Sequence, residues 1–494
     1  MRIVPGPDDL PRAIEAAQKE ASAAFGDASV FLEPYIEKPR HVEVQIFGDT
    51  HGNVVHLFER ECSIQRRYQK VIEESPSVAL DDELREAMCN AAVRAGRSIG
   101  YVNAGTVEFL LTPDHKFYFL EVNTRLQVEH PVTECVTGLD LVRLQILVAQ
   151  GHSLCDLLGD IALDGHCIEA RLYAEDPRHG FMPVSGRLHR FEFPSIEGVR
   201  IDSAVGNESE ISPYYDSMLA KVIAHAPTRA EAAQKLARCL SRARIHGLRT
   251  NRELLVRTLR HTEFLSGKID THFFERNAPE ELGAPEVDEA AEKLHAVAAA
   301  LSANAQRLTS RTNLPRIPSG WRNNRSQLQQ VKFASEHGEI EVGYAWQRRE
   351  LLIEIDGKPL EGVVLANRTA EEVVIQVIGV QRRFAIRRDK DTFFVDSPFG
   401  ASELRELPRF PLPEDEMQSG SLVAPLPGVI AEVKIAVDDT VNAGDVLVVI
   451  ESMKMLHDVN APLDGRVKEI RVNAASHVDA GTVLVVIDGN DSPE

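Results

Sequence analysis

Apolar and polar positions follow different spacings along the 494-residue chain, and each change of spacing predicts a different kind of element. A run rich in Ala, Glu and Gln predicts a helix from Asp8 to about Phe25. β-like segments and amphipathic helices then continue to about Asn277, and a second Ala- and Leu-rich helix is predicted from Val287 to Leu308. A chain of this length exceeds what one hydrophobic core usually organises, so we expect three or four domains.

The pattern changes again from Val331 to Val395, where short β-like strands alternate with turn residues. Glu350 to Ile355, directly before Asp356-Gly357, is one such strand. Residues Pro408 to Ser421 contain three prolines and several acids, which is typical of a solvated linker with some stiffness. A compact, valine-rich domain is predicted from about Leu422 to Ile487.

The last domain contains an internal repeat without gaps. Ala424–Gly428 recurs as Ala461–Gly465, and the same offset of 37 residues maps Ala443–Ile450 onto Ala480–Ile487. Two β-units that cannot each bury an apolar face alone pack against one another, so we predict a sandwich with pseudo-two-fold symmetry. Lys454 lies beside the midpoint of the repeat, in a short connection that predicts a tight hairpin with an exposed tip.

Methionines flank this lysine in Glu451-Ser452-Met453-Lys454-Met455, and beside an exposed turn they are unfavourable in water unless a partner binds them. The domain resembles a biotinyl carrier domain, whose hallmark is Met-Lys-Met at a hairpin between two half-repeats. The resemblance implies that a biotin-protein ligase joins biotin to Lys454 through an amide bond. Lipoyl domains share this fold but usually lack the Met-Lys-Met pairing. Ser452 stands where the family most often has Ala or Val.

A second candidate site is a segment with polar residues at alternate positions, namely Glu121, Asn123, Arg125, Gln127 and Glu129. If the segment is extended, all five point to one face. Glu108 lies on an upstream strand, and a two- or four-residue turn would place it opposite Glu121, whereas an odd loop length would separate them. Two carboxylates and an amide beside a phosphate suit Mg²⁺. The alternative is an outward strand face of salt-bridged residues.

The stretch from about Met1 to Asn277 resembles biotin carboxylase, a member of the ATP-grasp superfamily. The matching pieces are Pro39–Glu43, Cys62–Lys70, Gly105–Phe109, Glu121–His130, Glu169–Arg171 and Pro213–Met218. The resemblance implies that Glu108 and Glu121 are the principal Mg²⁺ or Mn²⁺ ligands, with Asn123 close to a second metal ion. It also implies an ATP site, lined on its adenine side by Glu33, Tyr35 and Ile36 and on its phosphate side by His41, Gln65, Gln69 and Lys70.

The same resemblance implies how bicarbonate is bound and activated. Arg125, Gln127 and the Val128 backbone would hold it, and Glu129 would act as the general base. Arg171 would steady the biotin enolate, so the implied catalytic set is Glu129, Arg125, Arg171 and Lys70. Family enzymes often carry His where this chain has Tyr68.

We therefore predict a multidomain α/β chain with a partial ATP-grasp core, a helix-plus-antiparallel-β linker domain and a C-terminal all-β barrel-sandwich domain. The expected boundaries are residues 1–36 for a remnant of the ATP-grasp lid, 37–163 for the catalytic subdomain, 164–277 for the biotin carboxylase C-terminal domain, 278–410 for the linker domain, 411–421 for a linker and 422–488 for the carrier. The family's N-terminal domain and glycine-rich lid loop have no counterpart in the sequence. We expect either a start codon assigned too late or a fragment.

The middle segment, which includes Ser319–Asn324, resembles the linker domain of propionyl- and methylcrotonyl-type α-subunits, where a β-barrel around one helix docks a carboxyltransferase β-subunit. A simple spacer is the alternative. The resemblance implies the α-subunit of a hetero-oligomeric acyl-CoA carboxylase, an ATP-dependent ligase that carboxylates biotin on Lys454 with bicarbonate before a separate β-subunit transfers the carboxyl group. The alternative is a carrier and docking subunit without its own catalysis.

Composition excludes several other classes of protein. The chain has 55 Lys plus Arg against 75 Asp plus Glu, a net charge of −20, which argues against general binding of nucleic acids or anionic membranes. No apolar run approaches the roughly 18 residues of a membrane span. The six cysteines show no paired metal-ligand spacing, as in reduced proteins, so we predict a cytoplasmic location.

Overall fold

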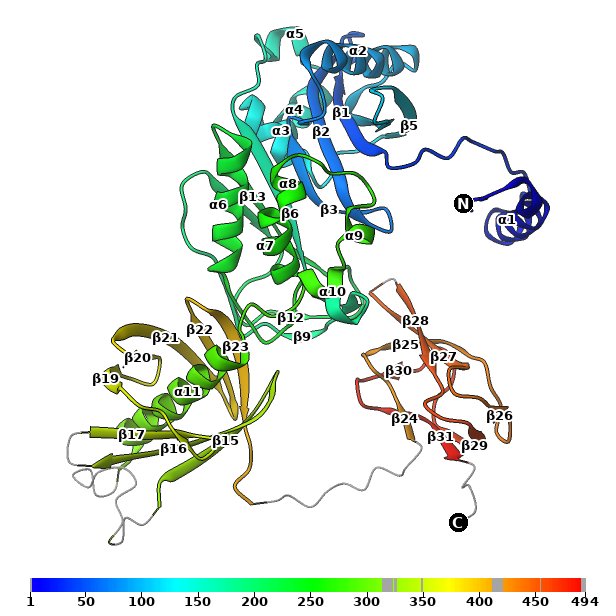
Figure 1. Cartoon of the computed structure of the whole chain (residues 1–494). Helices are drawn as coiled ribbons and strands as arrows, with labels where there is room; N and C mark the ends of the chain where they lie inside the picture. The colour runs from blue at the N-terminus through cyan, green and yellow to red at the C-terminus, as the bar shows by residue number, and fades with distance from the viewer. Residues whose placement is uncertain are drawn as a thin grey trace. The chain divides into compact units, whose positions relative to one another are not determined.

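The computed structural model in Figure 1 describes residues 2–312, 323, 327–347, 350–410, 421–453 and 455–489. The chain divides into two compact units, Met1–Asp164 with Gly267–Arg276, and Gly165–Ser266 with Asn277–Glu494. The domain boundaries given above stay predictions. Among the described residues, no helix combines the length and the apolar character needed to cross a membrane.

The first unit is built on five antiparallel strands in the order β3-β2-β1-β4-β5. The strands are β1 (Arg40–Gly48), β2 (Val54–Arg66), β3 (Gln69–Ser75), β4 (Asn103–Leu111) and β5 (Phe117–Asn123). The helices are α1 (Leu10–Phe25), α2 (Asp82–Ser98), α3 (His130–Thr137), α4 (Leu141–Ala149), α5 (Leu154–Leu157) and α9 (Phe273–Arg276). The predicted first helix begins two residues later than expected, after a 3-10 turn at Pro7–Asp9, and none of its residues is buried.

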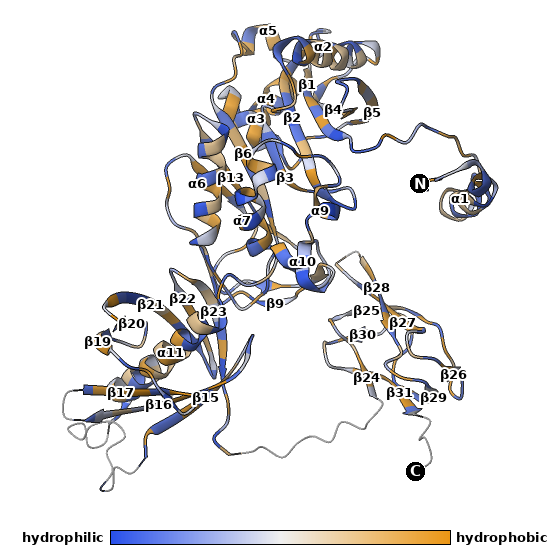
Figure 2. Cartoon of the chain, viewed as in Figure 1, coloured by the Kyte–Doolittle hydropathy of each residue, from blue (hydrophilic) through white to orange (hydrophobic). Residues whose placement is uncertain are grey.

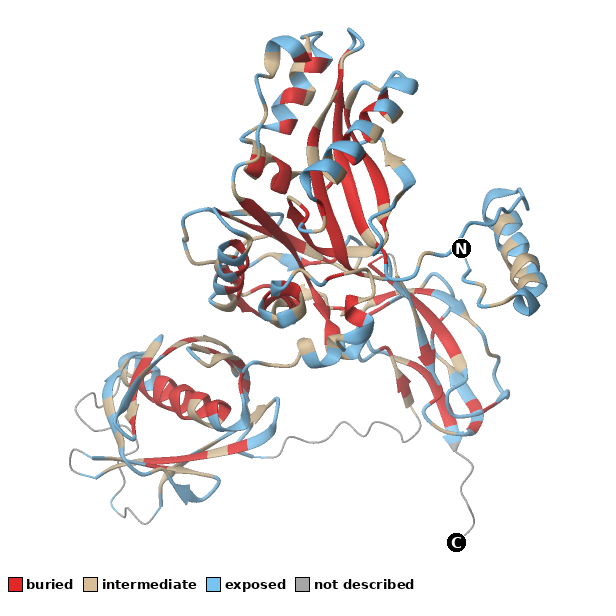
Figure 3. Cartoon of the chain, turned by 45° about the horizontal axis from the view of Figure 1, so that its top comes forward, coloured by how far each residue is buried: buried red, intermediate tan, exposed pale blue. Residues whose placement is uncertain are grey.

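The two faces of this sheet differ in chemistry, because successive strand side chains point to opposite sides. On one face, Val42 and Val44 of β1 pack with Met88 of α2 in an apolar core. On the other face, His41 and Glu43 are also buried. Figure 3 shows how much of the sheet is shielded from solvent. A buried polar face needs internal partners for each charge, which marks this face as a candidate site.

The second unit begins with three antiparallel strands in the order β11-β13-β6, covered by two helices. Thr228 and Glu231 form a capping box at the start of α6, which explains why that helix begins there. The elements are β6 (His166–Tyr173), β11 (Val199–Ser203), β13 (Met218–Ala226), α6 (Arg229–Ser241) and α7 (Arg252–Arg260). Shorter ones are β7 (Glu175–Asp176), η2 (Pro177–His179), β8 (Met182–Pro183), β9 (Gly186–Arg187), β10 (Arg190–Glu192), β12 (Glu210–Ile211), β14 (Arg244–His246), α8 (Thr262–Leu265) and α10 (Pro279–Leu282).

A nine-stranded antiparallel sheet curls around one long helix, α11 (Glu289–Ser310), which Figure 3 shows as a buried element surrounded by strands. The helix presents small apolar side chains from Ala296 to Ala305 on nearly all sides, and it is hydrophobic in Figure 2. Such a helix is stable only inside a core. The strands are β15 (Gln329–Ser335), β16 (Gly338–Gln347), β17 (Glu350–Ile355), β18 (Lys358–Pro359), β19 (Val363–Arg368), β20 (Glu372–Val377), β21 (Val380–Asp389), β22 (Thr392–Ser397) and β23 (Gly400–Glu406).

The repeat of 37 residues has a direct structural counterpart in two four-stranded sheets, β24-β31-β29-β26 and β28-β27-β25-β30. Strands β25, β26 and β27 start and end 37 residues before β29, β30 and β31. Gly428 and Gly465 are equivalent, because a Cβ on either would lie within 2.5 Å of a carbonyl oxygen on the neighbouring strand. The strands are β24 (Ser421–Val423), β25 (Gly428–Val433), β26 (Thr440–Val441), β27 (Val446–Ser452), β28 (Met455–Asn460), β29 (Gly465–Ile470), β30 (His477–Val478) and β31 (Val483–Gly489).

Candidate active site

A row of charged side chains crosses four neighbouring strands on the polar face of the first sheet. Arg60 of β2 is opposite Glu43 of β1, Glu43 is opposite Glu108 of β4, and Glu108 is opposite Glu121 of β5. Directly opposed residues of antiparallel strands lie on the same face with neighbouring Cβ atoms. Three carboxylates in line repel one another, so the row requires cations between them.

Lys70, the second residue of β3, supplies the central cation. Its Nζ donates to Glu43 Oε2 at 2.5 Å, to Glu129 Oε1 at 2.5 Å and to Glu108 Oε1 at 3.1 Å. The lysine is held there by the β2–β3 hairpin, whose turn residues Arg67 and Tyr68 both have positive φ, as a two-residue hairpin turn requires. One ammonium therefore links three carboxylates from β1, β4 and the segment before α3.

Burial and charge compete in setting the pKa values of this cluster. Burial would raise the pKa of Glu43, but Lys70 and Arg60 outweigh it and hold that pKa at about 2. For Glu108, burial is again outweighed, here by His41 and Lys70, and the pKa lies far below its usual range. Burial would lower the pKa of Lys70, yet Glu43 above all raises it well above the ordinary value. The carboxylates and the ammonium thus stabilise one another's charged forms.

Glu108 and Glu121 are paired, but not through the even-length turn on which the sequence argument relied. The loop between β4 and β5 covers residues 112–116, an odd number, which by itself would separate the two carboxylates. The register shifts by one residue between Glu108 and Phe109, because Phe109 is opposite Phe119 while Glu108 is opposite Glu121. This irregularity passes over Leu120 and restores the alignment. The condition of an even-length turn is not met, yet the two carboxylates lie opposite each other.

The chain remains extended only as far as Asn123, so the five alternate residues are not all on one strand face. Arg125 lies at an exposed bend, where its guanidinium donates to Asn123 Oδ1 at 3.4 Å. Gln127 and Glu129 are buried, in the turn that leads into α3. The Gln127 amide donates to Glu108 Oε1 at 2.9 Å. Tertiary packing thus brings Gln127 and Glu129 to the cluster although the strand ends before them.

The other predicted site residues are divided between the cluster and its surroundings. His41 Nε2 lies 2.9 Å from Glu108 Oε2, so it belongs to the cluster. Gln65 and Gln69 flank the β2–β3 turn, opposite Lys70 and Arg66 respectively. Arg171 lies on β6 of the second unit. Val128 is partly exposed, and Glu33, Tyr35 and Ile36 lie on an irregular segment before β1.

Sequence reasoning missed Arg60 and did not assign a role to Glu43. Alternation of His41, Glu43 and Gln45 along a strand is a signal for Glu43, since it indicates a polar face within an otherwise apolar strand. No local pattern around Arg60 distinguishes it from a surface arginine. Its side chain is nevertheless completely buried, so only the folded sheet reveals it.

The described side chains offer two groupings that could hold a metal ion, His41 with Glu43 and Glu108, and Glu43 with Cys62 and Glu129. Burial raises the pKa of the Cys62 thiol well above its usual value, so a thiolate ligand is disfavoured. The carboxylates are hard oxygen ligands of the kind Mg²⁺ prefers. A metal at Glu108 would replace protein donors there, because Lys70, Gln127 and Asn123 all donate to its Oε1.

The predicted attachment site lies in the hairpin formed by β27 and β28. Ser452 is opposite Met455, and Met453 is the first residue after β27. Met453 has a φ of 48° and is buried, and Met455 is half-buried. Lys454 itself is outside the described residues. The hairpin agrees with the expected short connection, while the biotin site stays a prediction.

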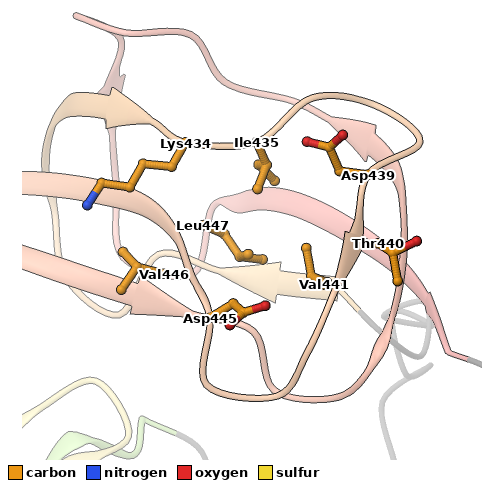
Figure 4. A pocket seen from close by; sticks show the side chains of 8 residues that line it. All are labelled: Lys434, Ile435, Asp439, Thr440, Val441, Asp445, Val446 and Leu447. Carbon is orange, nitrogen blue, oxygen red and sulfur yellow. The ribbon is translucent and has the colours of Figure 1, made fainter.

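Figure 4 shows a hollow in the carrier domain, which provides no second candidate active site. Its acidic side chains are used by local turns, since Asp439 Oδ2 accepts from the Ala436 N–H at 2.7 Å and Asp445 Oδ2 accepts from the Asn442 N–H at 2.7 Å. Both carboxylates stabilise the loops on which they lie. The hollow is therefore a consequence of the loop structure.

Four family models match successive parts of the chain. They are the ATP-binding domain of the carbamoyl-phosphate synthase L chain over residues 1–157, the biotin carboxylase C-terminal domain over 169–276, the BT domain of the methylcrotonyl-CoA carboxylase α-subunit over 291–409 and a biotin-requiring enzyme domain over 419–487. In this order, these matches define a biotin-dependent carboxylase. They confirm the predicted fold class.

The relatives that match nearly the whole chain are mitochondrial methylcrotonoyl-CoA carboxylase α-subunits. The Dictyostelium discoideum protein is 37% identical over 482 residues, which are 93% of this chain and 68% of the relative. The Mus musculus protein is 38% identical over 475 residues, 93% of this chain and 66% of the relative. The chain belongs to the family of biotin-dependent carboxylase α-subunits of the methylcrotonyl-CoA carboxylase type. It spans about two thirds of the length of these relatives.

Solved biotin carboxylase structures resemble somewhat more than half of the chain. The biotin carboxylase domain of a thermophilic 2-oxoglutarate carboxylase bound to bicarbonate matches with a TM-score of 0.54 and 42% identity, over 57% of this chain and 63% of that one. A biotin carboxylase from Campylobacter jejuni in complex with β-γ-ATP matches with a TM-score of 0.53 and 40% identity, over 56% and 62% of the two chains. A further structure of the thermophilic domain contains MgADP and bicarbonate, at a TM-score of 0.54 and 42% identity, over 57% and 62%.

Proposed function

We propose that this chain uses ATP and bicarbonate to carboxylate a biotin attached to Lys454. The observation that carries the proposal is the cluster in which Lys70 joins Glu43, Glu108 and Glu129. Such a cluster combines a buried carboxylate able to accept a proton with cationic donors able to stabilise phosphate charge. The similarity to biotin carboxylases crystallised with nucleotide and bicarbonate supports this assignment.

Glu129 is the proposed base, and it accepts the proton of bicarbonate so that the carbonate oxygen can attack the γ-phosphate, with ADP leaving and carboxyphosphate forming. The biotin ureido nitrogen then takes the carboxyl group, while phosphate leaves and accepts the ureido N–H proton. Lys70 and His41 would hold the phosphate oxygens, while the Gln127 amide and Arg125 would hold bicarbonate. Glu108, Glu121 and Asn123 form an oxygen-rich donor set suited to Mg²⁺ or Mn²⁺. A bound divalent ion would supply positive charge at the transferred phosphate. Arg171 would stabilise the enolate form of biotin.

Bicarbonate-dependent ATP hydrolysis in the presence of free biotin tests the activity. Glu129→Gln should lower kcat by about 10²- to 10⁴-fold, because the amide cannot accept the proton. Glu83→Gln, on the exposed first turn of α2, is the matched control and should leave kcat unchanged. A folded, biotinylated chain without bicarbonate-dependent hydrolysis would favour the alternative, a carrier and docking subunit that lacks its own ATPase.

Biotin attachment is proposed at Lys454, between the paired residues Ser452 and Met455 of β27 and β28. Intact-mass measurement after co-expression with a biotin-protein ligase should show one added biotin. Lys454→Arg should abolish the addition, and Lys434→Arg, on an exposed loop of the same domain, should not. Unmodified wild-type protein would contradict this part of the proposal.

The helix-centred barrel is proposed to dock a separate carboxyltransferase β-subunit, which would transfer the carboxyl group to an acyl-CoA. The match to a BT domain over residues 291–409 supports this role. Co-purification of the two subunits as a hetero-oligomer tests it, and loss of the complex on deletion of residues 289–406 is expected. We place the protein in the cytoplasm, and its six free cysteines accord with a reducing compartment.

A further inference from the structure

Arg60 lies beneath the cluster and is completely shielded from solvent, although it was not among the predicted site residues. A guanidinium carries five N–H groups in a rigid plane. Here those groups have five acceptors, each on a different residue. The acceptors are Glu43 Oε1 at 2.7 Å, Gln45 Oε1 at 2.8 Å, Thr133 Oγ1 at 3.0 Å, Thr106 Oγ1 at 3.2 Å and Gln127 Oε1 at 2.9 Å.

The bond to Gln127 settles which way that side-chain amide faces. An arginine only donates hydrogen bonds, so only the amide oxygen of Gln127 can face Arg60. The amide nitrogen must then point away from Arg60, and it donates to Glu108 Oε1 at 2.9 Å. Arg60 therefore turns the N–H donors of Gln127 into the cluster, where an anion can accept them.

The bond to Glu43 divides the two oxygens of that carboxylate between two cations. Oε1 accepts from Arg60 Nε, which leaves Oε2 for Lys70 Nζ. Arg60 thus fixes the carboxylate that in turn fixes the ammonium group. Since its own side chain is fully buried, it acts on the reaction only through Gln127, Glu43 and Lys70.

We propose that Arg60 is a positioning residue for bicarbonate, because it holds the Gln127 amide with its donors toward the anion. The inference rests on the proposed function and deepens it. A residue that served only to stabilise the fold would affect the binding of both substrates or of neither. Arg60 should instead act mainly on bicarbonate, because ATP would not use the Gln127 amide. Lys70, the proposed phosphate ligand, also donates to Glu108 and Glu129, so its position does not depend on Glu43 alone.

Steady-state ATP hydrolysis by the full chain, with bicarbonate and ATP varied separately, tests the proposal. Arg60→Lys keeps the charge but offers three donors from one point, so it cannot serve all five acceptors. Its KM for bicarbonate should rise about tenfold or more, with a change of KM for ATP below about twofold. Arg85→Lys is the control for a structural role, since Arg85 is a part-buried partner of Glu59 away from the cluster. It should lower the melting temperature without changing either KM.

If Arg60→Lys does not fold, two less disruptive variants distinguish the contributions of Nη1 and Nη2 of the guanidinium. Thr106→Val removes the acceptor that shares Nη2 with Gln127, and Thr133→Val removes one that shares Nη1 with Gln45. Only Thr106→Val should raise the KM for bicarbonate. Equal effects of the two variants, or parallel changes in KM for both substrates, would overturn the proposal.

Binding of ¹³C-bicarbonate, followed by NMR line broadening, distinguishes this inference from the proposed function. A wild-type chain that neither hydrolyses ATP nor broadens the bicarbonate signal overturns both. If the wild type broadens the signal and Arg60→Lys broadens it equally, only the role of Arg60 fails. Broadening by the wild type that is lost in Arg60→Lys supports the role, whether or not ATP is turned over.

Discussion

The barrel should lose stability as the pH falls below neutrality, because its central helix carries a buried histidine. His295 lies on α11, where its Nδ1 is 2.7 Å from Ser402 Oγ and its Nε2 is 2.7 Å from Ser397 Oγ. The ring also packs edge-on against Phe384 at 5.6 Å. Burial lowers the pKa of His295 from 6.5 to about 4, so the folded barrel keeps this side chain neutral.

The sign and size of the effect follow from the two pKa values. Between about pH 6.5 and pH 4, the unfolded chain binds a proton at His295 that the folded barrel does not bind, so acid favours unfolding. At about 1.4 kcal/mol for each pH unit in that interval, the full loss is about 3 kcal/mol. About 2 kcal/mol of it should be lost by pH 5.

Urea unfolding followed by tryptophan fluorescence measures this effect in the barrel. Both tryptophans of the chain, Trp321 and Trp346, fall within residues 278–410, and Trp346 lies on β16 beneath the Arg368 guanidinium. The reference variant is His295→Gln, which cannot titrate but keeps a donor and an acceptor.

The wild type should lose stability relative to His295→Gln as the pH falls from 7.5 to 5. His115→Gln, in the exposed loop between β4 and β5, should follow the wild type at every pH. If the curves for wild type and His295→Gln stay parallel between pH 7.5 and pH 5, the argument from burial is refuted.

Three further predictions concern the carrier domain and the first unit. Gly465→Ala should destabilise the carrier by about 3 kcal/mol or more, because the new Cβ would lie 2.4 Å from a backbone oxygen. The control Gly444→Ala, whose Cβ would meet no atom within 4 Å, should cost about 1 kcal/mol of backbone strain. Thermal unfolding of the carrier measures both effects. Ala475→Gly should raise the melting temperature of the carrier slightly, since the exposed Ala475 has a φ of 65°, and an unchanged or lower value would contradict this. Asp81→Ala should cost about 1 kcal/mol in urea unfolding of the first unit, because Asp81 caps α2 by accepting from the Leu84 N–H at 2.9 Å.

The sequence predicted the carrier domain well because its information is repeated. Each half contains the same glycine, valine and turn pattern, and equivalent strands begin and end at the same offset. The helix of the barrel was also predictable, since the described helix Glu289–Ser310 differs from the predicted one by two residues at each end. Both elements follow from local patterns that need no knowledge of distant contacts.

The candidate active site was harder to predict because its geometry depends on contacts between distant segments. Alternation indicated one strand face for Glu121 and Asn123, but it failed beyond Asn123, where the chain turns into α3. Arg60 is about as far along the chain from Gln127 as Lys70 is from Glu129, and each pair meets only through strand order and helix packing. Periodicity describes one element at a time, so it contains no information about such pairs.

The irregularity at Leu120 allows the β4–β5 hairpin to tolerate changes of length. With five residues in the loop, regular pairing would place Leu120 opposite Glu108, and the passed-over residue moves Glu121 there instead. Deletion of one loop residue together with Leu120 would leave a four-residue loop with uninterrupted pairing and the same two acids face to face. A change in the length of residues 112–116 can therefore be offset by the presence or absence of a passed-over residue at position 120, outside the loop.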